Sequence, residues 1–69
     1  GLRDYNSAIL DTDRAIQMSP NLAIAFVNRA FAFEQIGDRN RAIADYRRCL
    51  DLNPNDQFSR NALQRLGGL

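Results

Sequence analysis

Two prolines, Pro20 and Pro54, stand 34 residues apart in a chain of 69 residues, and each is followed by an asparagine. When segments 4–21 and 38–55 are aligned without a gap, eight of their eighteen positions are identical. Both segments also place apolar residues three and four apart, which is the spacing of one helix face. The chain therefore carries an internal helical repeat, the pattern typical of stacked helix arrays.

The two prolines also divide the chain into helices. A proline ends the helix before it, because the preceding residue is pushed out of the α region. Asn21 and Asn55 are placed to cap the helices that follow, unless each proline itself occupies the first turn. Gly37 suits a left-handed helix end, and Asp38 begins the next helix. Short connections make neighbouring helices antiparallel. The sequence predicts four helices, over residues 4–18, 22–36, 39–52 and 56–66.

The composition argues against several functional classes. The chain has no histidine and one cysteine, Cys49, so we predict no disulfide within it, no metal site and no cofactor. The formal net charge of +1 gives no electrostatic footprint for nucleic acid or an anionic membrane. No apolar run approaches the roughly 18 residues of a membrane span. We therefore expect neither nucleic acid nor a membrane as a partner.

Catalysis also has little support in the sequence. Cys49 has no histidine to act as its base, and it matches Ala15 in the repeat, so we predict a buried core thiol. Asp11 and Asp13 lie two apart on a helix and point to different faces, so they do not form a carboxylate pair. We predict that the chain is not an enzyme.

A run of arginines, residues 39, 41, 47 and 48, is the one feature that suggests a nucleic-acid surface. Three aspartates, Asp38, Asp45 and Asp51, interleave with it. Charges of alternating sign on one helix are typical of a solvated surface laced with salt bridges. We favour that interpretation over a nucleic-acid site.

The chain resembles the tetratricopeptide repeat, whose signature spaces aromatic, small and proline residues over 34 positions. The matching residues are Phe26, Ala30, Phe33, Ala42, Tyr46 and Pro54. The resemblance covers the whole chain. It implies an all-α fold in which antiparallel helix pairs build a right-handed solenoid.

The resemblance also divides the chain, which we expect to form a single unit over residues 1–69. Residues 1–20 would hold the second helix of a truncated repeat, residues 21–54 one full repeat, and residues 55–69 a C-terminal capping helix. The last helix has Arg60 and Gly67 where the full repeat has aromatic residues. A polar terminal helix suits the end of a solenoid.

Arg29 departs from the family signature, which prefers leucine at its position. A subset of these repeats carries Asn-Arg-Ala there together with an aspartate before the aromatic residue of the second helix. This chain has both features, at Asn28-Arg29-Ala30 and at Asp45-Tyr46. The resemblance therefore implies a structural ion pair in which Arg29 binds Asp45 in a forked geometry.

Repeats of this family form a superhelix, and the first helix of each pair lines its concave face. The positions that the resemblance places on this face are Ile24, Val27, Asn28, Phe31, Gln35, Phe58, Asn61 and Arg65. The alternative for Ile24, Val27 and Phe31 is packing against neighbouring helices. We predict a non-catalytic protein–protein interaction scaffold that binds a peptide or a partner domain on the concave face.

Some family members hold the C-terminal carboxylate of a chaperone in a clamp of lysine, asparagine and arginine. Asn28 matches one asparagine of such a clamp. Phe58 and Ala62, however, stand where the basic residues of the clamp belong. The sequence therefore disfavours a carboxylate clamp.

The alternative function is self-assembly through the first helix. Without a preceding helix to cover it, this helix would expose an apolar strip of Ala8, Ile9, Ala15 and Ile16. An exposed strip of this kind would allow the isolated segment to form a homodimer. In a longer protein, an upstream helix would cover the same strip.

Overall fold

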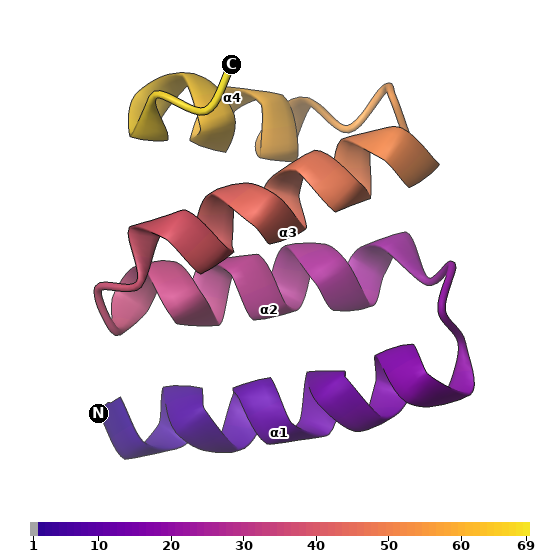
Figure 1. Cartoon of the computed structure of the whole chain (residues 1–69), viewed down its shortest axis with the longest axis vertical. Helices are drawn as coiled ribbons and strands as arrows, with labels where there is room; N and C mark the ends of the chain where they lie inside the picture. The colour runs from indigo at the N-terminus through magenta and orange to yellow at the C-terminus, as the bar shows by residue number, and fades with distance from the viewer. Residues whose placement is uncertain (1) are drawn as a thin grey trace.

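The four helices lie side by side in one stack, and each runs in the direction opposite to its neighbour (Figure 1). The computed structural model describes residues 2–69, with side chains from Asp4 onward. The helices are α1 (Leu2–Met18), α2 (Ala23–Gln35), α3 (Arg39–Leu52) and α4 (Gln57–Leu66). The predicted all-α fold of antiparallel helix pairs is confirmed, and each observed helix end lies within two residues of its predicted position.

The two Pro-Asn pairs form equivalent turns between helices. Leu22 N donates to Ser19 O at 3.1 Å, and Asp56 N donates to Asn53 O at the same distance. Each proline thus occupies the second position of a β-turn and each asparagine the third, as both residue types favour. The prediction that these asparagines cap the next helices is wrong, because each asparagine lies inside the turn and the residue after it takes the N-cap position. Asp56 caps α4 instead, and Leu22, the N-cap residue of α2, makes no side-chain capping hydrogen bond.

Two glycines close α2 and α4 in the same way. Gly37 and Gly67 have φ angles of +87° and +80°, a conformation that other residues rarely adopt. After α2, Gly37 N donates to Glu34 O and Asp38 N donates to Phe33 O, which is the hydrogen-bond pattern of a Schellman motif. The Asp38 side chain then accepts from Arg41 N and starts α3. Gly37 and Asp38 therefore act as the sequence predicts.

The core lies between α2, α3 and α4. Its buried residues are Ala30, Phe33, Ala42, Tyr46, Ala62 and Leu63. Ala30 and Ala42 are fully buried, and such small side chains allow α2 and α3 to approach closely. Cys49 is also buried, as predicted for a core thiol.

The apolar strip that we expected α1 to expose is half-buried. Ile9 packs against the core, and Ala8, Ala15 and Ile16 are partly covered. The expectation fails because α2 covers part of the strip. From Asp4 onward, the large apolar residues that α1 exposes are instead Leu10 and Met18, at 65% and 85%.

Arg29 joins three helices. From α2, its Nε and Nη2 atoms donate to the two carboxylate oxygens of Asp45 on α3, at 2.7 and 2.8 Å. Its Nη1 donates to Asp13 on α1, also at 2.8 Å. The Asp45 side chain is only 9% exposed, whereas that of Asp13 is 43% exposed. The hydrogen bond to Asp45 raises the pKa of Arg29, so the guanidinium keeps its charge. Asp13 is a partner that sequence reasoning missed.

Glu34 makes the corresponding link between α2, α3 and α4. Its carboxylate accepts a hydrogen bond from Tyr46 Oη on α3, at 3.0 Å, and pairs with Arg65 on α4. The hydrogen bond from Arg65, supported by the one from Tyr46, lowers the pKa of Glu34. Two polar links, centred on Arg29 and Glu34, thus span all four helices.

We expect Arg29→Leu to lower the free energy of unfolding by about 3 kcal/mol, because it leaves the Asp45 carboxylate buried without a partner. Removing that carboxylate as well, in Arg29→Leu with Asp45→Ala, should restore most of the loss. Urea unfolding of the single and double variants measures both effects. Asp13→Asn serves as the control and should cost only about 0.5 kcal/mol, because this pair is half-exposed. Losses that simply add in the double variant would contradict the link.

Glu34→Gln should lower stability by roughly 1 kcal/mol at neutral pH. Because the folded-state pKa of Glu34 is lowered, its ionised form stabilises the fold above the unfolded-state pKa of about 4.3. That contribution is lost as the pH falls through the lower folded-state pKa. The difference between the wild type and Glu34→Gln in urea unfolding should therefore shrink on acidification. A difference that stays constant to pH 2.5 or so would rule out this role.

Candidate interaction surface

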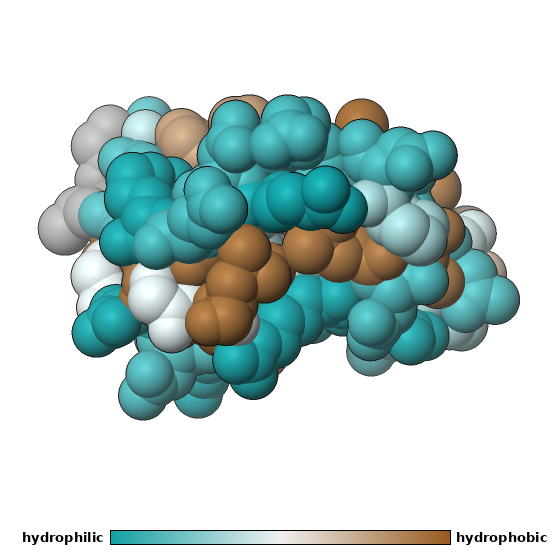
Figure 2. Space-filling model, turned by 90° about the horizontal axis from the view of Figure 1, so that it is seen from above, coloured by the Kyte–Doolittle hydropathy of each residue, from teal (hydrophilic) through white to brown (hydrophobic). Residues whose placement is uncertain are grey.

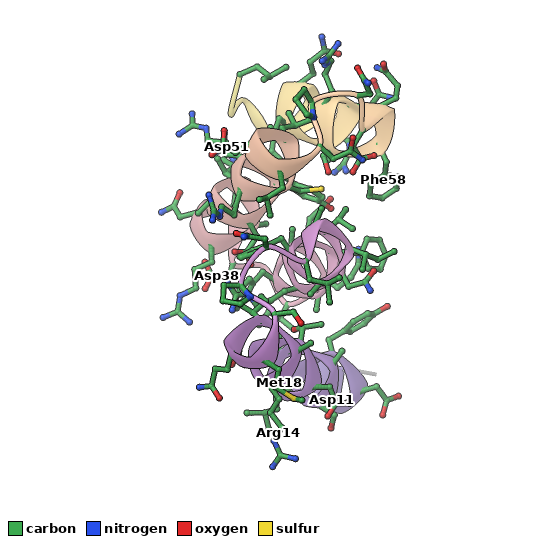
Figure 3. The ribbon with its side chains drawn as sticks, turned by 90° about the vertical axis from the view of Figure 1, so that its right-hand side faces the viewer. Asp11, Arg14, Met18, Asp38, Asp51 and Phe58 are labelled. Atoms are coloured by element: carbon green, nitrogen blue, oxygen red, sulfur yellow. The ribbon has the colours of Figure 1, made fainter. Side chains whose placement is uncertain are left out.

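An open groove of about 470 Å³ runs between α2, the end of α3 and the beginning of α4. The residues that line it are Ala23, Ile24, Val27, Asn28, Phe31, Cys49, Asn53, Asp56 and Phe58. Seen end-on, Phe58 points outward on one side of the stack, whereas Asp38 and Asp51 lie on the opposite side (Figure 3). The groove, which Phe58 lines, therefore opens on the side of the stack opposite these two aspartates.

The structure brings together five of the eight residues expected on the concave face: Ile24, Val27, Asn28, Phe31 and Phe58. They share one side of α2 and the first turn of α4. Ile24, Phe31 and Phe58 are 62%, 42% and 53% exposed, so packing between the helices covers these side chains only in part. Large apolar side chains gathered in an exposed groove are typical of an interaction site.

The other three expected residues do not line the groove. Gln35 is exposed at the last residue of α2. Asn61 accepts a hydrogen bond from Gln57 Nε2 at 2.8 Å, one turn away on α4. Arg65 pairs with Glu34, as described above. Asn61 and Arg65 thus bind other side chains of this chain, and Gln35 lies at the end of its helix.

Two aromatic contacts hold the large groove residues. The Phe31 ring meets Tyr5 of α1 edge-on, with ring centroids 6.3 Å apart. The Phe58 ring meets the buried Tyr46 of α3 at 6.2 Å, tilted by 53°. Aromatic pairs of this geometry contribute beyond simple burial. Both rings are thus supported by a neighbouring helix while they keep an exposed face.

Asp56 is the one charged residue among the groove's lining residues. Its carboxylate accepts hydrogen bonds from the Cys49 thiol at 3.1 Å and from Ser59 Oγ at 2.8 Å. The same side chain caps α4 by accepting from Phe58 N at 3.2 Å. The bond from Cys49, followed by those from Ser59 and Phe58, lowers the pKa of Asp56, so its carboxylate is ionised at neutral pH.

Sequence reasoning missed four lining residues: Ala23, Cys49, Asn53 and Asp56. Asn53 and Asp56 flank the Pro54-Asn55 turn, so the signal that they lie at a helix corner was present. These two residues lie beside α2 because of how the helices pack, and the repeat pattern does not predict that packing. Cys49 matched a small core position in the repeat, and no feature of the sequence indicated that it also borders the groove.

The groove is poorly suited to covalent chemistry. Burial raises the pKa of the Cys49 thiol, and its neighbour Asp56 adds to this, so the reactive thiolate is disfavoured. Within residues 2–69, no three His, Cys, Asp or Glu side chains are grouped so as to hold a metal ion. The described helices also include none with the length and apolar character needed to cross a membrane. The lining groups suit non-covalent contact with an apolar ligand.

The arginines of α3 contact this chain itself. Arg39 Nε donates to Leu66 O at 2.8 Å, and Arg47 Nε donates to Gly68 O at 2.9 Å. Arg41 pairs with Asp38 at the start of its own helix. Arg48 lies over the Phe26 ring, with the guanidinium carbon 5.7 Å from the centroid. Arg39, Arg47 and Arg48 therefore join α3 to its neighbours. Among the described residues, the expected salt bridges between the run and its interleaved aspartates are limited to that of Arg41 with Asp38.

Figure 2 looks onto the α4 end of the stack, where polar side chains surround an apolar strip. The exposed polar residues of α4 are Gln57, Arg60, Asn61, Gln64 and Arg65. The end face is thus mostly polar, with an apolar part left open. The division of the chain into a truncated repeat, a full repeat and a capping helix stays a prediction.

Comparison with known proteins bears on the family of this chain. The family model described as "Tetratricopeptide repeat" matches residues 23–56, from the start of α2 to the cap of α4. The chain is also similar to "Small glutamine-rich tetratricopeptide repeat-containing protein 2" of Mycosarcoma maydis. The two are 40% identical over 65 residues, which make up 94% of this chain but only 18% of the relative.

Within the matched residues, α2 and α3 pack closely and antiparallel. The similarity to the relative extends over α1 and α4 as well, because it covers nearly the whole chain. The chain belongs to the tetratricopeptide repeat family.

Proposed function

We propose that this chain binds an apolar segment of a partner protein in the groove between α2 and α4. Tetratricopeptide repeats serve generally as non-catalytic scaffolds for protein–protein interactions. The observation that carries the proposal is the gathering of three exposed apolar side chains, Ile24, Phe31 and Phe58, in one open groove. The relative is much longer than this chain, so the proposal concerns this segment alone.

The chemistry of the lining indicates which peptides the groove would favour. Ile24, Val27, Phe31 and Phe58 supply apolar surface, and burying an exposed aromatic or aliphatic side chain against a ligand is worth about 1.5–3 kcal/mol. The Asn28 amide can both donate to and accept from a peptide backbone. The groove would thus hold a peptide through its apolar side chains and fix its backbone at Asn28.

The charge of the groove argues against a carboxylate ligand. Its lining contains Asp56 but no arginine or lysine. A carboxylate clamp needs cations, and the nearby Arg65 is paired with Glu34. The groove would therefore prefer neutral or basic apolar peptides to acidic ones.

A peptide array of random decamers, probed with the folded chain, tests this proposal. Bound peptides should be rich in apolar residues and poor in acidic ones. For a selected peptide, Phe31→Ala should weaken binding about tenfold or more, measured by fluorescence polarisation. Asn28→Ala should weaken it less, because the amide makes a contact that water can partly replace.

Leu10→Ala is the matched control, because Leu10 is also a large exposed apolar residue but lies on α1. It should leave the affinity unchanged. Circular dichroism of each variant separates lost binding from lost folding. An affinity that falls with Leu10→Ala and not with Phe31→Ala would move the site away from the groove.

Self-assembly through α1 is a second candidate function, and the exposure of Leu10 and Met18 favours it. The chain would then form a homodimer through these side chains. Sedimentation velocity over a wide concentration range should show a species of twice the 7.8 kDa mass, which Met18→Gln dissociates. A monomer at every concentration would exclude this candidate.

A further inference from the structure

The groove between α2 and α4 is lined by two exposed aromatic rings, Phe31 of α2 and Phe58 of α4, which we call the groove rings. Tyr5 and Tyr46 each support one of them from the side, so both rings keep part of their π surface open. An aromatic face carries partial negative charge, and it therefore attracts cations as well as apolar groups.

The other two phenylalanines of the chain already bind cations of the chain itself. Over the Phe26 ring lie Arg29 and Arg48, with their guanidinium carbons 5.5 and 5.7 Å from the centroid. Over the Phe33 ring lie Arg29 and Arg41, at 5.9 and 5.7 Å. No guanidinium of a described residue lies over either groove ring at such a distance. The groove rings are thus free to stack with a guanidinium that a ligand brings.

Asp56 places a negative charge beside one of these rings. Its Oδ1 accepts one hydrogen bond, from Phe58 N, and its Oδ2 accepts two, from Cys49 and Ser59. Because a carboxylate offers about four acceptor sites, one site on Oδ1 is left for another donor. All three present donors are neutral, so they do not cancel the charge.

No cation of the described chain neutralises this carboxylate. The ion pairs among the described residues do not include Asp56. Arg60, one turn further along α4, donates to Pro54 O instead. The positive end of the α4 dipole offsets roughly half of a unit charge. A net negative potential therefore remains at this end of the groove.

Two amide side chains add neutral acceptors to the same groove. Asn28 and Asn53 both line it and are exposed. Among the described residues, neither amide side chain has a hydrogen-bond partner. A guanidinium has five N–H donors, more than the one remaining site of Asp56 can accept. The amide oxygens can accept some of the others.

We propose that the groove recognises an arginine side chain in the segment that it binds. The guanidinium would lie over the exposed Phe58 ring and donate to the adjacent carboxylate of Asp56. Its methylene stem would pack on the apolar side chains of α2. Arginine suits this site better than lysine, because a planar guanidinium stacks on a ring and donates in its own plane at the same time. The inference rests on the proposed function, since it names the side chain by which the groove selects its peptide.

The test compares three end-capped, fluorescein-labelled peptides of leucine and serine that differ only at one central position. That position holds arginine, its neutral analogue citrulline, or glutamate. Fluorescence polarisation with the folded chain measures the three affinities. The arginine peptide should bind about fivefold or more tightly than the citrulline peptide. This advantage should shrink as sodium chloride is added, because the groove is open to solvent.

Asp56→Asn should reduce the advantage of arginine over citrulline to within about twofold. Asparagine is as good an N-cap as aspartate, so the variant keeps the start of α4. Asp51→Asn is the matched control, because it changes the net charge equally but lies on the opposite side of the stack (Figure 3). It should leave the advantage unchanged. If Asp56→Asn does not fold, the three peptides still test the inference on the unchanged chain.

Equal binding of the arginine and citrulline peptides would overturn this inference and leave the proposed function standing. Tighter binding of the glutamate peptide would also overturn it, as would an arginine advantage that Asp51→Asn removes and Asp56→Asn does not. If none of the three peptides binds, the inference is wrong. The array of random decamers, probed with the same protein, then shows whether the proposed function fails as well.

Discussion

A single guanidinium held between two carboxylates links the first three helices. Arg29 leaves α2 on the side opposite the groove and is bound by Asp45 of α3 and by Asp13 of α1. A partly buried charge has to be paired, so the buried pair with Asp45 restricts the rotation of α2 against α3, whereas the half-exposed pair with Asp13 is a weaker link to α1. With α2 held in this way, helical geometry turns Ile24, Val27 and Phe31 toward the open side. The apolar side chains of α2 thus face the groove, while the charge of Arg29 is satisfied on the opposite side of the helix.

The sequence predicts what depends on period and local geometry. The 34-residue spacing predicts the four helices, and Gly37 and Asp38 predict one of their corners. The prediction of asparagine caps was wrong because each Pro-Asn pair occupies the two central positions of a β-turn. The backbone hydrogen bonds of Leu22 and Asp56 close these turns. Asp13, Asp56 and the pairing of Arg65 could not be predicted, because each depends on the contact of helices far apart in sequence. Five of the expected groove residues lie together because they share helix faces that the repeat defines.

Two surfaces of different character follow from this arrangement. The groove is apolar, supported from beneath by Tyr5 and Tyr46, and suited to a ligand that brings apolar side chains. The outer side of α1 is polar at Asp11 and Arg14, which are exposed and point away from α2 (Figure 3). On α2, the side chains that line the groove and the side chain that pairs with α1 and α3 occupy different sides of the helix.

The exchange of the Arg29 side-chain Nε–H with water, followed by ¹⁵N NMR at neutral pH, tests the central claim most directly. The account predicts that this proton is protected, because Nε donates to Asp45 at 2.7 Å in a site that is mostly shielded from water. Its signal should persist where that of the exposed Arg14 in the same spectrum is lost to exchange, and Asp45→Asn should remove most of the protection. An Arg29 Nε–H that exchanges as fast as that of Arg14 would contradict the account, because the three helices would then not be joined through this charge.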